Sequence, residues 1–219
     1  MANNEMDNNK IDNNKIFKCL RCGSCCCPKI EPDKTRYIPI YLDELDIILE
    51  KSRDLQKNIK VRPDLVYADT LNNQLIETTF ELIVYDECEF YNRKSKSCII
   101  YKDRPLTCKA FPVLTWRPDG HRKFLQINSK CKFISQNMWL YDCSYSELET
   151  FFPNEYKSAK ELMDTGREIL YKILQLESDG IIDIGFLSNN REIFGLDVDI
   201  NNKTFKNWKR IKLSEIEIE

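Results

Sequence analysis

Residues 18–28 read K-C-L-R-C-G-S-C-C-C-P, and this stretch decides how the chain folds. Five cysteines fall within nine residues in the pattern C-x2-C-x2-C-C-C. Two thiolates separated by two residues can reach one metal ion from a single tight loop, whose backbone N–H groups can point at the sulfurs. Gly23 permits the unusual dihedral angles that such a loop needs. Lys18 and Arg21 add positive charge that favours the thiolate form. The stretch therefore predicts a thiolate metal site.

Further cysteines follow at longer spacings. They are Cys88, Cys98, Cys108, Cys131 and Cys143. These spacings are too long to form a site alone, so they contribute only if the fold brings them beside the first cluster. The sequence holds one histidine, His121, and ligation would be almost entirely by thiolate. Thiolates suit zinc and iron–sulfur clusters alike. The first run also lacks the fourth cysteine of the bacterial ferredoxin spacing, so the residues leave the metal open.

Cysteine usage and the absence of long apolar segments indicate the cellular compartment in which the protein is expected to work. The chain has ten cysteines in 219 residues. This cysteine fraction is below the roughly 8–10% that is typical of a disulfide scaffold. Residues 1–15 are rich in Asn and Asp and carry no apolar signal segment. No later run approaches the ~18 apolar residues of a membrane span. We expect a cytoplasmic protein without membrane association, because clustered cysteines in a reducing compartment more often hold metal than disulfides.

The charge balance does not favour nucleic acid. Lys and Arg total 33 and Asp and Glu total 35, so the formal net charge is −2. No strong overall field attracts a polyanion. Basic residues gather within 93–96 and 206–212, and we interpret both groups as solvated faces.

Hydrophobic periodicity predicts a mixture of helices and short strands. Helices are expected over 42–52 and 155–177, strands over 76–84, 98–101 and 194–200, and a hairpin over 113–116 and 123–127. Asn154 is the expected N-cap of the long helix and Gly180 its stop. The pattern predicts an α+β fold, a small metal-stapled domain with short antiparallel strands and a few helices. We expect a disordered tail over 1–15, a cysteine-cluster metal-binding domain over 16–150, and a helix and strand extension over 151–219 packed on it.

Three motifs occur in order: F-K-C-L-R-C-G-S-C-C at 17–26, C-I-I-Y-K-D-R-P at 98–105 and C-K-A-F-P at 108–112. In these motifs the chain resembles the CxxCxxCC cysteine-cluster family, a largely uncharacterised family of zinc- or iron-chelating domains whose members are often labelled iron–sulfur proteins. The resemblance covers roughly residues 17–135. It implies the metal ligands Cys19, Cys22, Cys25, Cys26, Cys88, Cys98 and Cys108, with Cys131 at a weaker later position. The third consecutive cysteine, Cys27, departs from the family pattern, so the choice between Cys26 and Cys27 stays open.

Eight thiolates suffice for two four-cysteine sites, or for one [4Fe–4S] cluster plus one zinc ion. Adjacent side chains tend to point apart, so Cys25 and Cys26 can serve different metals or different corners of one cluster. Arg104, as a cofactor-binding residue, could balance the negative charge of a cluster. The alternative for Arg104 is a salt bridge to Asp103 or another acid. Cys143 fits a core position better than a ligand position.

Three functions are compatible with these residues. The first is an iron–sulfur protein that exchanges electrons with an unknown protein partner and could act as an oxidoreductase. The second is a zinc-binding module with a structural or interaction role, since a closed four-thiolate zinc site does no chemistry. The third is a protein-lysine methyltransferase-like activity, by analogy with flagellin lysine N-methylases, which share the cysteine motif but are longer. The sequence leaves open whether the chain catalyses anything.

Overall fold

The structure is a computed structural model that describes residues 16–26, 35–116, 124–184 and 207–216. Several sequence-based expectations fall outside these ranges: the tail over 1–15, Cys27, His121 and the late strand over 194–200. None of the helices in the described ranges combines the length and apolar composition that a membrane crossing needs.

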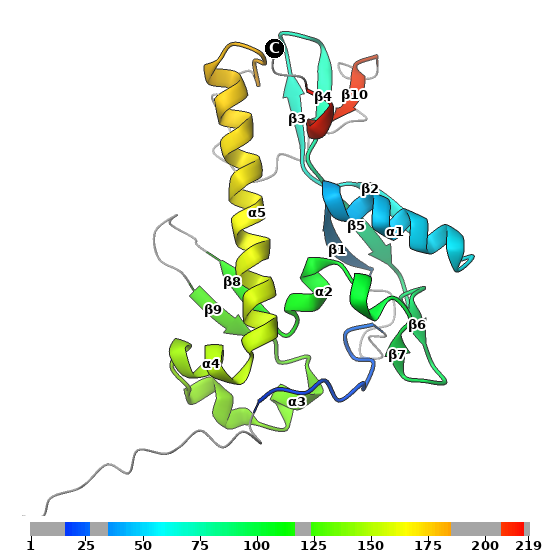
Figure 1. The fold of residues 1–219 in the computed structure, drawn as a ribbon, viewed down its shortest axis with the longest axis vertical. Helices are drawn as coiled ribbons and strands as arrows, with labels where there is room; N and C mark the ends of the chain where they lie inside the picture. Colours follow the sequence, from blue (N-terminus) through cyan, green and yellow to red (C-terminus); the bar gives the residue numbers. More distant parts are fainter. Residues whose placement is uncertain (1–15, 27–34, 117–123, 185–206, 217–219) are drawn as a thin grey trace, which may run out of the picture.

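The chain combines short strands, most of them in its first half, with helices that gather in its second half (Figure 1). The strands are β1 (Arg36–Tyr41), β2 (Lys60–Pro63), β3 (Val66–Asp69), β4 (Gln74–Glu77), β5 (Thr79–Val84), β6 (Tyr91–Asn92), β7 (Ser97–Cys98), β8 (Val113–Trp116), β9 (Phe124–Ile127) and β10 (Lys209–Lys212). The α-helices are α1 (Leu42–Asp54), α2 (Leu106–Ala110), α3 (Lys132–Ser135), α4 (Tyr145–Phe151) and α5 (Pro153–Ser178). Short 3-10 turns are η2 (Tyr101–Asp103), η3 (Met138–Asp142) and η5 (Leu213–Glu215).

The strands form four small sheets, which confirms the predicted α+β class. One three-stranded sheet has the order β1-β5-β2 and is antiparallel throughout. A second has the order β10-β4-β3, in which β4 is antiparallel to β3 but parallel to β10. The pairs β6-β7 and β8-β9 are hairpins. The parallel pair departs from the expected antiparallel pattern, because the buried Ile211 of β10 aligns with the buried Ile76 of β4 and closes an apolar core.

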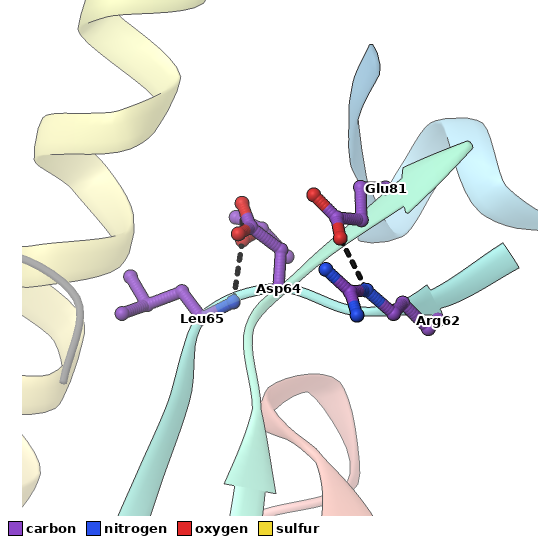
Figure 2. A network of polar contacts seen from close by, with 5 residues as sticks. Arg62, Asp64, Leu65 and Glu81 are labelled. Carbon is purple, nitrogen blue, oxygen red and sulfur yellow. Dashed lines mark hydrogen bonds and ion pairs between the residues drawn. The ribbon is translucent and has the colours of Figure 1, made fainter. Parts of the chain in front are cut away.

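The structure divides the strand predicted over 76–84 into two strands, β4 and β5. Because β4 and β5 belong to different three-stranded sheets, the residue between them connects the two larger sheets. Thr78 is fully buried, and both its N–H and its hydroxyl donate to the Leu65 carbonyl, at 3.0 and 2.9 Å. The Leu65 N–H in turn donates to the Thr79 hydroxyl at 3.1 Å. Figure 2 shows this bend beside the ion pair between Arg62 of β2 and the buried Glu81 of β5. The chain thus passes from β4 in one sheet to β5 in the other without leaving these polar groups unpaired.

Helix α1 begins where predicted, and its first turn positions α2. The Glu44 carboxylate accepts a hydrogen bond from the Tyr41 N–H at 3.1 Å, which closes a capping box. Its other oxygen accepts from the Leu106 N–H at 2.5 Å, at the first turn of α2. One half-buried carboxylate therefore satisfies amides at the starts of two helices. This link matters because α2 carries Cys108.

The long predicted helix is α5, which lies against α2 and β8 (Figure 1). The expected N-cap at Asn154 is wrong, because the helix starts two residues earlier than predicted, at Pro153, with Phe152 as its N-cap. Proline suits the first helical position, where its missing N–H would have no partner. Gly180 has a φ of 71° and follows the last turn, as expected of a helix stop.

The turn after β3 holds the C-terminal end of α5 through one buried carboxylate. Asp69 is fully buried and accepts four hydrogen bonds. The donors are the backbone N–H groups of Leu71 (3.1 Å) and Asp183 (3.0 Å) and the side-chain amides of Asn72 (2.7 Å) and Gln74 (2.7 Å). Burial by itself would raise the pKa of Asp69, but these hydrogen bonds together hold it below its ordinary value of 3.8.

We expect Asp69→Ala to destabilise the protein by roughly 2–4 kcal/mol, because it leaves several buried donors without an acceptor. Chemical denaturation measures this, with the exposed Asp86→Ala as the matched control. The ionised carboxylate stabilises the fold above its ordinary pKa, and this contribution is lost as the pH falls through the lower folded value. The stability gap between wild type and variant should therefore narrow in acid. If the difference in unfolding free energy between wild type and Asp69→Ala stayed constant down to pH 2, the ionised Asp69 carboxylate would not be the stabilising group.

Candidate metal centre

The N-terminal loop, residues 16–26, joins two separate hydrophobic cores. At one end the Phe17 N–H donates to the Phe151 carbonyl at 2.7 Å, and the Phe17 ring packs between Phe133 and Phe152, with centroids 5.1 Å from each. At the other end the loop reaches the segment that leads into β6 (Figure 1). There the N–H of residue 88 donates to the carbonyl of residue 26 at 2.9 Å. The loop therefore carries its cysteines across the space between the cores.

Gly23 lets this loop press against the β6–β7 hairpin. Its φ is 79°, as the sequence predicts, and Arg21 also takes a positive φ, of 49°. A Cβ at position 23 would lie 2.6 Å from the Tyr91 hydroxyl oxygen, which is closer than real contacts allow. Tyr91 pairs with Cys98 across the hairpin. A side chain at position 23 would therefore force the end of the Tyr91 ring to move, in addition to the strain of its positive φ.

The β6–β7 hairpin brings two distant cysteines together. The Tyr91 N–H donates to the Cys88 carbonyl at 2.8 Å, and the Ile99 N–H donates to the carbonyl of the buried Phe90 at 2.8 Å. These bonds fold the chain back on itself, so that Cys88 and Cys98 both lie within electrostatic range of Cys25 in the loop.

Helix α2 supplies a further thiol from another direction. Cys108 lies on α2, which is held by the Glu44 carboxylate and by a 3.1 Å hydrogen bond from the Thr107 hydroxyl to the Pro39 carbonyl. Burial above all, together with the nearby thiols Cys88 and Cys25, raises the pKa of Cys108 to about 12. A bound cation would favour the thiolate form of this sulfur.

Five thiols thus converge from three parts of the chain. This inner thiol group consists of Cys25, Cys26, Cys88, Cys98 and Cys108. The Cys25 and Cys26 sulfurs lie 3.7 Å apart. Their contact is the largest cause of two opposite shifts, because it lowers the pKa of Cys25 and raises that of Cys26. Burial raises the pKa of both Cys88 and Cys98. Because ionising one thiol disfavours ionising its neighbours, full ionisation needs a bound cation.

Two guanidinium groups face the inner thiol group, and sequence reasoning found only one of them. Arg36, at the start of β1, donates from Nη1 to the Cys25 carbonyl. Its Nε and Nη2 are buried and have no hydrogen-bond partner among the described residues. Its charge lowers the pKa of Cys25 and Cys88. No motif marks Arg36, since it follows the cysteine stretch by several residues and opens an ordinary strand.

Arg104 is the guanidinium that the sequence singled out. Its Nε donates to the Tyr101 carbonyl at 3.0 Å, and its guanidinium lies 3.9 Å from the centroid of the Tyr101 ring. Its charge lowers the pKa of Cys25, Cys98 and Cys108. Asp103, the acid considered as its alternative partner, instead pairs with Lys51 at 3.3 Å.

The remaining ligand candidates lie at the other end of the loop. This outer thiol group consists of Cys19, Cys22 and Cys131. Burial would raise the pKa of Cys22, but hydrogen bonds from Ser24 and from the Lys132 backbone together lower it. Cys131, which precedes α3, is buried, and its burial raises its pKa. Cys143 is half-buried and packs against the hydrophobic core that also contains Cys131.

The donor set fits a thiophilic metal. All nine cysteines in the described ranges are free thiols rather than disulfides. The 3.7 Å separation of the Cys25 and Cys26 sulfurs matches the roughly 3.8 Å edge of a tetrahedral zinc site with Zn–S bonds of about 2.3 Å. Within the described ranges no three His, Cys, Asp or Glu side chains are already arranged around a single ion position.

The family model CxxCxxCC, a zinc- or iron-chelating domain, matches residues 18–132. The match covers more than half of the chain and contains every residue of the inner and outer thiol groups, whereas Cys143 lies outside it. No match was found among curated proteins or among solved structures.

We expect Gly23→Ala to reduce the metal content and to destabilise the protein by more than the roughly 1–2 kcal/mol that a left-handed alanine costs. The matched control is Gly180→Ala, which has a similar φ of 71° but nothing within 4 Å of the added carbon. Adding Tyr91→Phe should recover part of the loss at Gly23, because it removes the clashing oxygen. Equal losses for the two alanine variants would show that contact with Tyr91 does not matter.

Proposed function

Because the chain belongs to the CxxCxxCC family of zinc- or iron-chelating domains, and so binds zinc or iron, we propose that its inner thiol group holds a [4Fe–4S] cluster that exchanges electrons with a protein partner. The observation that carries this proposal is Arg36, a buried guanidinium beside the thiols with two donor nitrogens that lack a partner among the described residues. A cluster would supply one-electron redox chemistry when bound.

The unpaired donors of Arg36 need an acceptor. A buried N–H without one costs about 1–3 kcal/mol, and here two such groups lie beside Cys25 and Cys88. A thiolate-bound cluster carries net negative charge and offers sulfur acceptors. Arg36 and Arg104 would then neutralise part of that charge and set the reduction potential through hydrogen bonding and burial.

The ligand set follows from where the thiols lie. Cys88, Cys98 and Cys108 would supply three ligands, from the hairpin and from α2. The fourth would come from Cys25 or Cys26, which present adjacent sulfurs to the same space. The free thiols throughout the described ranges support a reducing, cytoplasmic setting for this chemistry.

A structural zinc module is the second candidate, and one distance favours it. The Cys25 and Cys26 sulfurs already lie 3.7 Å apart, close to the roughly 3.8 Å edge of a four-thiolate zinc site. A structural zinc site contributes about 10–16 kcal/mol, which rivals the stability of a whole domain. Such a centre would tie the loop, the hairpin and α2 together without redox chemistry.

The composition of the anaerobically purified protein tests the proposal. We expect a brown protein with iron and acid-labile sulfide, whose visible absorbance bleaches on adding dithionite. A colourless protein with stoichiometric zinc and no iron would reject the redox proposal and leave the structural module.

Cys108→Ser should lose most of the inner metal, because it removes the only thiol that α2 contributes to the inner group. Cys143→Ser is the matched control and should keep full metal content. Metal analysis together with thermal melting gives both results. Retention of full metal content and melting temperature by Cys108→Ser would remove Cys108 from the ligand set.

Arg36→Gln should lower the reduction potential of the cluster, because reduction adds negative charge that the guanidinium no longer offsets. Arg36→Lys should restore part of the shift, and the exposed Arg53→Gln serves as the control. Redox titration under anaerobic conditions measures all three potentials. If Arg36→Gln kept the wild-type potential, Arg36 would have no electrostatic role at the cluster.

A further inference from the structure

We infer that the segment from the β6–β7 turn to η2 is the docking surface for the electron-transfer partner, and that this partner is a protein with an acidic surface. The inference rests on the proposed redox function and adds the class of partner and the place where it binds. The β6–β7 surface consists of the exposed residues Lys94, Lys96, Ile99, Tyr101 and Lys102.

The β6–β7 surface is positively charged on a chain whose formal net charge is −2. Residues 91–102 contain four cations and no carboxylate. Arg93 forms an ion pair, but Lys94, Lys96 and Lys102 form none with any residue that the structure describes. By contrast, two cations of the other basic group, on β10, are ion-paired. Lysines without a neutralising partner attract an acidic protein and speed its association.

Hydrogen bonds hold the turn that carries two of these lysines in one shape. The Asn92 side-chain oxygen accepts from the N–H groups of Lys94 at 2.9 Å and Ser95 at 3.1 Å. Lys96 has a φ of 51°, a left-handed conformation that glycine or asparagine adopts with less strain. The chain therefore keeps a cation at a position that favours a smaller residue. A turn ordered in advance also lowers the entropic cost of binding.

Two large apolar side chains are exposed beside these cations. Ile99 is 38% exposed and Tyr101 is 53% exposed. Tyrosine is enriched in protein interfaces, and weak electron-transfer complexes need less than about 1,200 Å² of buried surface. Arg104 already covers one face of the Tyr101 ring, which leaves less of that ring for stacking on a nucleic-acid base. Apolar contacts beside cations therefore favour an acidic protein over a nucleic acid.

The β6–β7 surface lies directly over residues of the inner thiol group. Ile99 follows Cys98 in the chain, so one peptide bond separates an exposed side chain from a proposed ligand. The Arg104 guanidinium lies 3.9 Å from the centroid of the Tyr101 ring, and its Nη1 donates to the Cys108 carbonyl at 3.5 Å. A stacked pair thus bridges solvent and the start of α2. A partner seated here would be separated from the cluster by few atoms.

The first test measures where electrons leave the full-length protein, purified without oxygen, reduced with dithionite and desalted. Stopped-flow absorbance follows its reoxidation, in which one electron passes from the reduced cluster to ferricyanide and gives ferrocyanide. The variant Lys94→Gln/Lys96→Gln should react about tenfold more slowly at low ionic strength. The difference should shrink in 1 M NaCl, where the screening length is about 3 Å. The cationic oxidant tris(phenanthroline)cobalt(III) should instead react faster with this variant.

The matched control is Lys157→Gln/Lys160→Gln, which removes two exposed charges from α5. It should react with both oxidants at the wild-type rates. Iron content and visible absorbance, measured first for every variant, show that the cluster is equally loaded in each.

The second test measures binding of a protein-like partner by fluorescence anisotropy. The probe is a fluorescein-labelled peptide of glutamates interspersed with leucines. The wild type should bind it about fivefold more tightly than a peptide with serines in place of the leucines, because Ile99 and Tyr101 add apolar contact. Lys94→Gln/Lys96→Gln should weaken binding of the leucine peptide by about fivefold, and the α5 control should not.

Each contrary result has a distinct meaning. Wild-type ferricyanide rates in a brown Lys94→Gln/Lys96→Gln variant would overturn the docking surface and leave the proposed cluster in place. Tighter binding of single-stranded oligo-dT than of a leucine peptide of equal charge would assign the surface to nucleic acid and overturn the protein partner. A colourless wild-type protein without iron would overturn the proposed function, and the electron-transfer surface with it.

Discussion

One backbone hydrogen bond, from the Cys88 N–H to the Cys26 carbonyl, joins the first cysteine loop to the rest of the thiols. The loop starts in the aromatic core around Phe17 and ends against the hairpin, so it connects two hydrophobic cores. Its path is possible because Gly23 takes a left-handed conformation and leaves space for Tyr91. If this loop were displaced, cysteines from three parts of the chain would no longer share one environment.

The electrostatics of the inner thiol group are unusual for a protein interior. Several buried thiols have raised pKa values, because burial and neighbouring thiols both disfavour the thiolate. Two guanidinium groups oppose this, and Arg36 retains buried donor nitrogens without partners in the described ranges. A region with surplus positive charge next to thiols that resist ionisation is balanced when an anionic metal–thiolate assembly forms there.

Sequence patterns predicted the long helix, α1 and the β8–β9 hairpin, because each has a clear period or strong turn residues. They missed β1, β2 and β10, which are short and pair with strands that are not their neighbours in sequence, and also β3, which is short and pairs with the adjacent β4. The basic residues of β10 were interpreted as a solvated face, and two of them form ion pairs: Arg210 with Glu77 at 2.6 Å and Lys212 with Asp46 at 3.5 Å. Cysteine spacing indicated the thiols of the site but not their division into two groups, which depends on how the loop crosses between cores. Arg36 had no signal at all, because its role comes from its place in the fold.

Helix α5 has a mechanical consequence. Its 26 residues span about 39 Å at 1.5 Å per residue. Near one end it lies against α2, which carries Cys108, and at the other its exit is held by the turn around Asp69. Such a helix behaves as a rod, so a tilt of about 5° at the α2 end would displace the far end by roughly 3 Å over that length. The far end of α5 shares a core with β4 and β10 through Ile173 and Leu176, so such a tilt would act on that core.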